Sequence, residues 1–312
     1  MQMDLFNKTV TEAVPFMKWV GGKRQLIPEI ENILPSNIKK TRTINSYIEP
    51  FIGGGALFFY LLSYYDVKEA YISDINKELI LAYNVIKRDH SSLIDNLKGL
   101  ESEYLKLNQE KRNDFYLDIR SKFNKDLESF DFSTFDEESI QRASYTLFMN
   151  RTGFNGLFRF NKKGEFNVPP GKYKNPKICD DENITNVHHI LKNVNIVNDS
   201  YLASEDFINE KSLVYLDPPY RPISKTSSFT SYSTDEFNDD EQIKLAEYFK
   251  RISDKGAYVI LSNSDPHNED EMDDFFDDLY KDFTIDRVLA KRSINSRGDK
   301  RGPVNELLIR NY

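Results

Sequence analysis

Cysteine, tryptophan and histidine are scarce in this chain of 312 residues, which has one, one and four of them. The single cysteine, Cys179, excludes intrachain disulfides and is typical of a protein kept in a reducing cytoplasm. No group of cysteines and histidines has the spacing of a zinc site, so we expect no metal. Apolar runs of the ~20 residues that cross a bilayer are missing, and residues 1–11 lack the apolar core of a signal peptide. These absences predict a cytoplasmic protein without a membrane partner.

Acidic residues outnumber basic ones and the net charge is −8, but the two signs are segregated along the chain. Residues 142–177 hold eight basic residues and one acid, Glu165, and residues 287–302 hold six and one, Asp299. A hydrophobic content of 39% with 29% charged residues is typical of a globular protein. The charge pattern predicts a basic cleft on an acidic body, which suits nucleic acid.

Residues 269–278 carry much of the negative charge, and the apolar residues among and just after them recur at helical spacing. Met272, Phe275, Phe276 and Leu279 occupy positions i, i+3, i+4 and i+7. The spacing predicts a helix whose acidic side faces solvent.

The stretch from Leu213 to Tyr220 is the most informative part of the sequence. Its first four residues are apolar and β-prone, which predicts a buried strand of a parallel sheet. Asp217, Pro218, Pro219 and Tyr220 follow, and two prolines end the strand because they donate no ladder hydrogen bond. Ligands of α/β proteins bind at this end of a strand. The Asp217 carboxylate and the Pro218 carbonyl could each accept an N–H from an exocyclic amine, with Tyr220 stacked on the ring. The alternative is a strand that ends in a plain Pro-Pro turn.

A glycine-rich turn lies early in the chain. Residues 46–52 predict a strand, Gly53 to Gly55 a turn, and residues 56–64 a helix, as in the first unit of a nucleotide-binding fold. The turn lacks the lysine of a phosphate-binding loop, so it favours a ligand without phosphates. A second predicted strand, residues 70–76, carries Asp74 near its end, about 20 residues after the turn. In Rossmann-like folds an acid at this position accepts hydrogen bonds from ribose hydroxyls.

The segment before this unit contains the only tryptophan, Trp19, between Lys18 and Lys23. Two glycines precede a helix predicted over residues 25–34, so the backbone could approach a ligand there. Trp19 could equally be an anchor of the core beside a plain loop.

About a hundred residues separate the second predicted strand from the third, which includes residues 195–197. The first part, to about residue 144, is mostly helical, and an insertion of this size suggests a subdomain. It ends in residues 150–161 and 164–174, where glycine turns present aromatic, asparagine and arginine side chains. Arginine suits guanine, asparagine suits adenine, and an aromatic ring can wedge into a base stack. The alternative is a β-hairpin that packs its aromatics into a small core.

The remaining chain completes the predicted sheet. Strands are expected over residues 257–261, 285–290 and 304–309, and an amphipathic helix over 240–252 through Ile243, Ala246, Phe249 and Ile252. Residues 226–234 predict a loop over the site, and residues 291–301 a basic loop.

Taken together, these motifs resemble the Dam-type DNA adenine-N6 methyltransferases, and the similarity runs nearly end to end. The order of the motifs is that of the alpha group of amino-methyltransferases. The motifs are residues 16–23, 49–55, 74–76, 151–161, 164–174 and 217–220. The resemblance implies a Rossmann-like, S-adenosylmethionine-dependent methyltransferase sheet with an inserted helical and β-hairpin DNA-recognition domain. The catalytic domain would be residues 1–76 and 178–312, and the target-recognition domain residues 77–177.

The motifs and the resemblance together imply three sets of site residues. The catalytic residues are Asp217, Pro218 and Tyr220. The residues that bind S-adenosylmethionine are Trp19, Lys23, Glu49, Pro50, Phe51, Gly53, Gly55, Asp74, Ile75 and Asp217. The residues that bind DNA are Lys18, Arg151, Phe154, Asn155, Leu157, Arg159, Tyr173 and Lys174, to which the basic loop adds Arg297. Phe154 stands where the family often has tyrosine, so a hydroxyl contact would be lost there.

The expected activity is transfer of a methyl group from S-adenosylmethionine to N6 of a flipped-out adenine in double-stranded DNA, within GATC. The expected partner is double-stranded DNA, and the expected state is a monomer. A companion restriction endonuclease is possible, and the sequence leaves open whether the protein has one or works alone. An amino-methyltransferase acting on cytosine N4 or on RNA is an alternative, because Asp-Pro-Pro-Tyr recognises an amino group in general. A catalytically inactive DNA-binding protein of the same fold is another. The helical stretch 100–135 is longer than in the best-known members, and its role is open.

Overall fold

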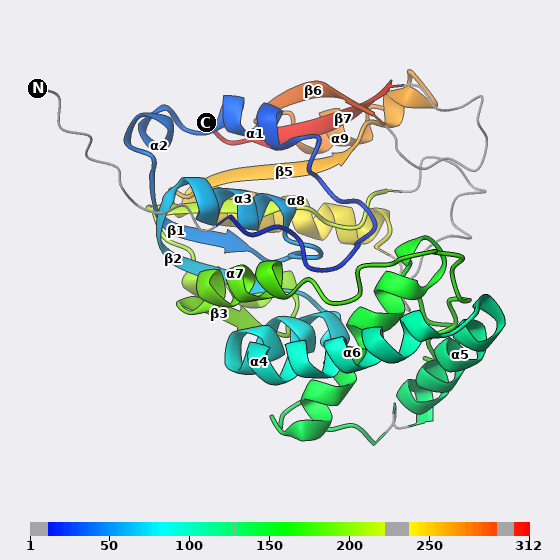
Figure 1. Cartoon of the computed structure of the whole chain (residues 1–312). Coiled ribbons are helices and arrows are strands. Elements are labelled where there is room, and N and C mark those ends of the chain that lie inside the picture. Colours follow the sequence, from blue (N-terminus) through cyan, green and yellow to red (C-terminus); the bar gives the residue numbers. More distant parts are fainter. Residues whose placement is uncertain (1–11, 126, 128, 222–236, 292–302) are drawn as a thin grey trace, which may run out of the picture.

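The computed structural model describes residues 12–125, 127, 129–221, 237–291 and 303–312. Within these residues it forms a seven-stranded sheet in the order β3-β2-β1-β4-β5-β7-β6 (Figure 1). The pairs among β3, β2, β1, β4 and β5 are parallel, and β7 runs antiparallel to both β5 and β6. The strands are β1 (Thr43–Glu49), β2 (Asp66–Ser73), β3 (Val194–Val197), β4 (Ser212–Leu216), β5 (Tyr258–Ser264), β6 (Thr284–Lys291) and β7 (Pro303–Arg310). Each predicted strand is therefore confirmed, to within a few residues at its ends.

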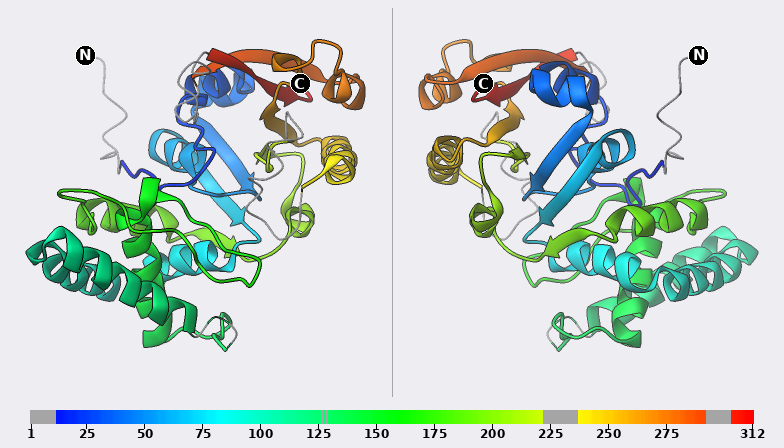
Figure 2. Two further views of the ribbon diagram at one scale, coloured as in Figure 1. Left: turned by 90° about the vertical axis from the view of Figure 1, so that its right-hand side faces the viewer. Right: turned by 90° about the vertical axis from the view of Figure 1, so that its left-hand side faces the viewer.

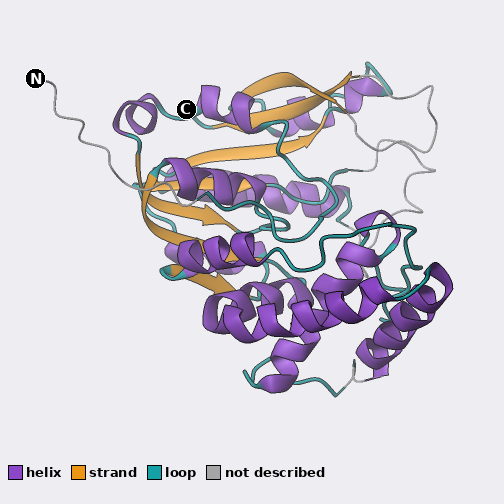
Figure 3. Ribbon diagram, in the orientation of Figure 1, coloured by secondary structure: helices purple, strands orange, loops and turns teal. Residues whose placement is uncertain are grey.

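Helices cover both faces of this sheet (Figures 2 and 3). One face carries α1 (Ile27–Ile33), α3 (Ala56–Tyr64), the start of α4 (Lys77–Lys106) and α7 (Asp181–Leu191), and the other carries α8 (Asp239–Asp254) and α9 (Phe275–Leu279). Successive strand residues point to opposite faces, so Leu213 and Tyr215 of β4 join the first core while Val214 and Leu216 join the second. All five residues of β4 are buried, which explains its nearly continuous apolar sequence.

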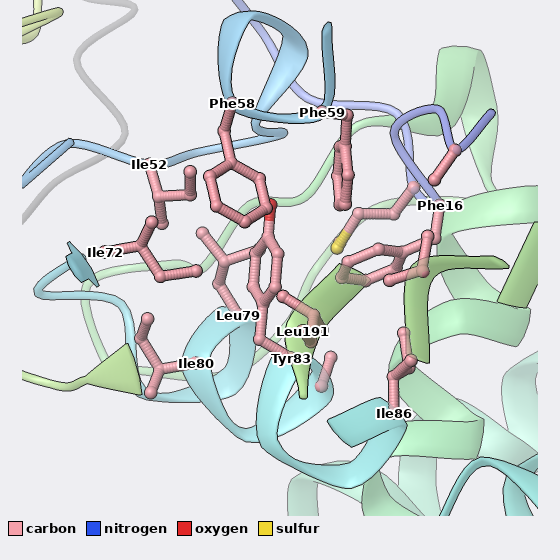
Figure 4. Close-up of a cluster of buried hydrophobic side chains, with 14 of the residues drawn as sticks. Phe16, Ile52, Phe58, Phe59, Ile72, Leu79, Ile80, Tyr83, Ile86 and Leu191 are labelled. Atoms are coloured by element: carbon pink, nitrogen blue, oxygen red, sulfur yellow. The ribbon is translucent and has the colours of Figure 1, made fainter. Parts of the chain in front are cut away.

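The first core includes the beginning of α4, which follows β2 directly (Figure 4). Asn76 caps this helix by accepting the Leu79 amide at 3.1 Å. Tyr83 lies edge-on to Phe16 with ring centroids 4.7 Å apart. The first turns of α4 therefore belong to the layer over the sheet. The boundary between two domains at residue 77 stays a prediction.

Beyond a kink at Asp89, α4 leads into the predicted insertion, which continues with α5 (Gln109–Lys125) and α6 (Glu137–Thr152). Figure 1 shows these helices as a lobe below the sheet, with α5 on the side to which the strands' carboxyl ends point. After α6 comes a loosely paired hairpin, residues 153–174, which we call the hairpin segment. It has single antiparallel bridges at Gly153–Pro170 and Phe160–Phe166, and a short 3-10 helix, η1 (Phe154–Gly156).

Two details of the predicted elements are wrong, and one short helix was not predicted. The acidic run does not form a helix from Met272: α9 spans only five residues, and Met272 lies in a turn with 83% of its surface exposed. Ile243 is on the outer side of α8, 41% exposed, and the buried Gln242 takes a place on the inner side. A short helix, α2 (Ser36–Thr41), precedes β1 and was not predicted.

The predicted basic surface is smaller than the charge count suggests. Arg142 is buried and paired with Glu78, so it contributes nothing to the surface. Arg287 binds Asp265 and Asp277 at 3.0 and 2.6 Å, so these two acids, of which Asp277 belongs to the acidic run, neutralise its charge. The predicted loop 226–234, residues 292–301 of the basic loop, and Arg297 lie outside the described residues. Within the described part of the chain, no helix is long and apolar enough to cross a membrane.

Candidate active site

Asp217 lies immediately after β4, between side chains from two distant parts of the chain. Its Oδ1 is 2.9 Å from Nζ of Lys23 and accepts a hydrogen bond from Ser262 Oγ at 3.0 Å. Burial raises the pKa of the Asp217 carboxyl above its ordinary value, and the Lys23 ammonium and the Ser262 hydroxyl oppose that rise. The site therefore holds a partly desolvated carboxylate with one cationic partner.

The ring of Tyr220 forms the next wall of this site. The Lys23 ammonium lies over it, 4.2 Å from the ring centroid, and also donates to the Gly21 carbonyl at 2.9 Å. The Tyr220 hydroxyl donates to Oε2 of Glu306 on β7 at 2.8 Å. A nitrogen that bears hydrogens thus sits against both the Asp217 carboxylate and the aromatic face. The site thus combines a hydrogen-bond acceptor with an aromatic face, two features that an amino group on a stacked planar ring could use.

A buried polar network fixes the turn formed by the two prolines. Gln242 Nε2 donates to the Pro219 carbonyl at 3.1 Å, and Gln242 Oε1 accepts from Asn263 Nδ2 at 3.1 Å. Asn263 Oδ1 then accepts the Arg221 amide at 3.4 Å. Gln242 and Asn263 are fully buried, so these bonds are strongly favoured and hold the backbone direction after Asp217.

Sequence reasoning missed four of these neighbours: Ser262, Asn263, Gln242 and Glu306. Weak signals were present. Ser262 and Asn263 follow directly after the apolar residues 258–261 in the same strand, and Glu306 is the one acid in β7. A polar residue in a strand that is buried on both faces needs a partner, so these positions could have been flagged.

Most of the predicted cofactor residues lie at or just after the neighbouring carboxyl ends of β1 and β2. Asp74 accepts the Gly53 amide at 3.1 Å and the Asn76 amide at 2.9 Å, and burial raises its pKa. Ile75 beside it is 61% exposed. The structure thus joins the glycine turn to the acid about 20 residues later. Contact of Asp74 with ribose hydroxyls stays a prediction.

Gly53 has φ +45°, a left-handed conformation, and an added Cβ would lie 2.9 Å from Trp19 Cδ1. Trp19 therefore packs directly on the glycine turn. Glu49, at the end of β1, is buried and accepts the Tyr47 hydroxyl at 2.6 Å, and burial raises its pKa well above the ordinary value. Further cofactor candidates lie at the same edge: Pro50 is buried, Phe51 is half-buried, and Gly55, at φ +69°, precedes α3.

Asn150, a buried side chain near the end of α6, binds the main chain of Lys18, one of the predicted DNA residues. Its Oδ1 accepts the Lys18 amide at 2.8 Å, and its Nδ2 donates to the carbonyls of Lys18 and Gly156, each at 2.9 Å. The exposed Lys18 side chain lies over the ring of Tyr173, 4.9 Å from its centroid. One asparagine thus ties the N-terminal segment to the hairpin segment.

The other predicted DNA residues differ in exposure. Phe154 is 50% exposed, and Asn155 beside it is exposed in a left-handed conformation, φ 56°. Leu157 packs against the core, and Lys174 is exposed. Arg151 donates to the Phe16 carbonyl at 2.8 Å, and Arg159 Nε donates to Asn167 Oδ1 at 2.7 Å. Contact of any of them with DNA stays a prediction.

Comparison of the sequence with known proteins places the chain in a family. Residues 19–294 match the model of the D12 class N6 adenine-specific DNA methyltransferases. The type II methyltransferase M.MjaIII of Methanocaldococcus jannaschii is 48% identical over 302 residues, 96% of this chain and 100% of that protein. The type II methyltransferase M1.LlaDCHI of Lactococcus lactis subsp. cremoris is 38% identical over 99% of both chains. The DNA adenine methylase of Escherichia coli K12 is 32% identical over 94% of this chain and 93% of that one. The chain therefore belongs to the D12 class of N6 adenine-specific DNA methyltransferases.

Proposed function

We propose that the protein transfers a methyl group from S-adenosylmethionine to N6 of an adenine flipped out of double-stranded DNA, within the sequence GATC. The observation that carries this proposal is the position of Asp217 beside the Tyr220 ring. Asp217 accepts N–H donors, and the ring faces the donor that Asp217 binds. An adenine amino group has both properties, a hydrogen-bond donor and a planar ring to stack.

The amino nitrogen of adenine is a poor nucleophile because its lone pair is delocalised into the ring. Asp217 and the Pro218 carbonyl accept its two N–H groups, which favours tetrahedral geometry and localises the lone pair on N6. Tyr220 stacks on the extruded base and offsets part of the few kcal/mol that flipping costs, at about 1–3 kcal/mol. The catalytic work of these residues is positioning and electrostatic stabilisation.

The residues at the ends of β1 and β2 suit a nucleoside-bearing methyl donor. Trp19 closely approaches the glycine turn, Asp74 is a half-buried acceptor, and Ile75 offers an exposed apolar surface. In this proposal Trp19, Lys23, Asp74, Ile75 and Asp217 hold S-adenosylmethionine, with Glu49, Pro50, Phe51, Gly53 and Gly55 shaping the site. When bound, the cofactor supplies an activated methyl group on a sulfonium.

Target recognition is assigned to the hairpin segment and to Lys18. Phe154 is half exposed at the start of the segment, where a ring can fill the gap left by a flipped base. The Arg159 guanidinium can donate two hydrogen bonds to O6 and N7 of a guanine, which discriminates by ~1–3 kcal/mol. Asn155, Leu157, Tyr173, Lys174 and Arg151 complete this surface or support it.

The family match favours adenine in DNA over the alternatives of cytosine N4 or RNA. The type II names of two relatives support a companion restriction endonuclease as partner, and a monomer remains our expectation for this chain.

A panel of synthetic duplexes tests the proposal. One contains GATC, and the others replace one base pair of that sequence at a time. Each is incubated with the protein and S-adenosylmethionine carrying a labelled methyl group, then digested to nucleosides. We expect label in N6-methyladenine from the GATC duplex and little from the others. Label in N4-methylcytosine would refute the target base, and equal labelling of all duplexes would refute GATC.

A further inference from the structure

Helix α5 carries four polar side chains at intervals of four residues, so they form one row along the helix. They are Arg112, Tyr116, Arg120 and Asn124, and we call them the α5 ladder. All four form hydrogen bonds with main-chain groups of the hairpin segment. Hydrogen bonds are directional, so this row fixes the lengthwise position of the segment as well as its distance from α5.

Asn124 makes the most complete contact of the row. Its Nδ2 donates to the Phe166 carbonyl at 3.0 Å, and its Oδ1 accepts the Phe166 amide at 2.9 Å. Both main-chain groups of one hairpin residue are thus satisfied by one side chain. The Phe166 ring itself is buried, so water cannot readily replace these bonds.

The next two members of the α5 ladder hold Val168. The Tyr116 hydroxyl and Nη1 of Arg120 both donate to the Val168 carbonyl, each at 3.1 Å. Asn167 therefore lies between two residues whose backbones are bound to α5. Farther along, Arg112 links the Lys174 carbonyl, at 2.8 Å from Nη1, to the end of α4 through the Tyr104 carbonyl, at 3.1 Å from Nε.

Asn167 connects this brace to Arg159. Its side-chain Oδ1 accepts Nε of Arg159 at 2.7 Å, and its amide donates to the Arg159 carbonyl at 3.1 Å. The contact at Nε fixes the plane of the guanidinium, because Nε and the two terminal nitrogens are coplanar. The orientation of the Arg159 fork is thus coupled through Asn167 to the α5 ladder.

We propose that the α5 ladder and Asn167 are positioning residues that set the sequence selectivity of the enzyme by aiming the guanidinium of Arg159. This inference rests on the proposed guanine contact of Arg159. It gives a role to the long helical stretch 100–135, whose function the sequence left open. Bidentate recognition tolerates little misalignment, so loosening the brace should weaken discrimination before it weakens methyl transfer.

The test measures kcat/KM on the GATC duplex and on the duplexes altered at single positions, for a set of variants. Asn124→Leu removes both bonds to Phe166, and Arg120→Met independently removes one bond to Val168, in case the first variant fails to fold. Lys122→Ala is the matched control, because Lys122 is on α5 but exposed and paired only with Asp118 among the described residues. Arg159→Ala and the double variant Arg159→Ala with Asn124→Leu complete the set.

We expect Arg159→Ala to lower discrimination at one guanine, and Asn124→Leu to lower it about tenfold at that same position. In the Arg159→Ala background Asn124→Leu should change discrimination no further, and Lys122→Ala should change nothing. A uniform loss of activity in Asn124→Leu and Arg120→Met, with discrimination kept, would overturn the positioning role while leaving the proposed function intact. Unchanged discrimination in Arg159→Ala would overturn the guanine contact and the positioning role with it.

Discussion

The carboxyl of Asp217 lies between groups that act on its pKa in opposite directions. The hydrogen bond from Ser262 lowers this pKa, and the negative charge of Glu306 raises it, while burial keeps it above the ordinary value. Asp217 must be ionised to accept N–H groups, so kcat/KM should fall on the acid side as Asp217 takes up a proton. We expect Ser262→Ala to move this acid limb to higher pH and Glu306→Gln to move it to lower pH. The pH profile of kcat/KM checks both, and shifts of equal sign would contradict the assignment of the limb to Asp217.

Glu49 is a second buried acid, and burial raises its folded-state pKa well above its unfolded value. The unfolded state then loses this proton first as pH rises, so ionisation of Glu49 favours unfolding above about pH 4. Replacement by glutamine removes that effect. We expect Glu49→Gln to shift the free energy of unfolding toward greater stability at pH 8 than at pH 4, and the difference between the two shifts should be at least about 1 kcal/mol. Urea titrations at the two pH values measure it, and a difference of zero would show that Glu49 ionises normally in the folded protein.

The sequence predicted that Asp217 and Tyr220 lie at the end of a strand, but it did not predict which side chains surround them. Asp217 follows an apolar strand and precedes two prolines, so its place at a strand end is a local property. Ser262 and Glu306 reach it from β5 and β7, and that contact depends on the order of strands in the sheet. The spacing of residues in the sequence therefore does not predict the contacts of Ser262 and Glu306 near Asp217.

Among the elements, α4 and α6 are joined by a buried ion pair. Arg142 Nη2 is 2.5 Å from Glu78 Oε1, and the guanidinium lies 4.2 and 4.6 Å from the ring centroids of Phe123 and Phe130. This pair connects the start of α4, which lies over the sheet, with the helical lobe. Breaking a buried pair leaves an unpaired charge, so Arg142→Met should lower the unfolding free energy by ~3–5 kcal/mol at neutral pH.

Two controls make this prediction sharper. Lys122→Met breaks an exposed pair with Asp118 and should cost less than about 1 kcal/mol. The loss in Arg142→Met should shrink at acidic pH, because the isolated Glu78 then takes up a proton. Equal costs for the two variants in denaturant titrations would show that the buried pair gives no more stability than a surface one.

The pattern of apolar residues predicted the strands better than the short helices. Strand β4, which is buried on both faces, is apolar after Ser212, and two prolines follow it closely. The spacing from Met272 to Leu279 is that of a helix, yet the helix begins only at Phe275. Arg287 binds Asp265 before the stretch and Asp277 within it, and these ion pairs hold the chain in place. The α5 ladder escaped prediction for a related reason. Its side chains bind backbone groups, which carry no sequence signal.

The whole molecule has a net negative charge, and so does DNA, its expected substrate. The positions of the exposed lysine and arginine side chains therefore decide how the protein binds DNA. Residues 291–301 hold five basic residues and one acid, and we expect them to contact phosphates. Replacing Arg297 and Lys300 with alanine should weaken binding equally for GATC and unrelated duplexes. The slope of log K against log salt should fall by about one for each lost contact. Titrations at several salt concentrations measure this, and an unchanged slope would remove the loop from the interface.

In the proposed mechanism, Asp217 acts on the amino group of a flipped adenine. The most direct test of this role is single-turnover methyl transfer by Asp217→Ala on a GATC duplex. Base flipping is followed in parallel through the fluorescence of 2-aminopurine at the target position. We predict that transfer is lost while the fluorescence rise on binding and the thermal unfolding of the protein are retained. A variant that keeps more than about a tenth of the wild-type rate would contradict the account, because the largest expected transition-state contact would then be absent.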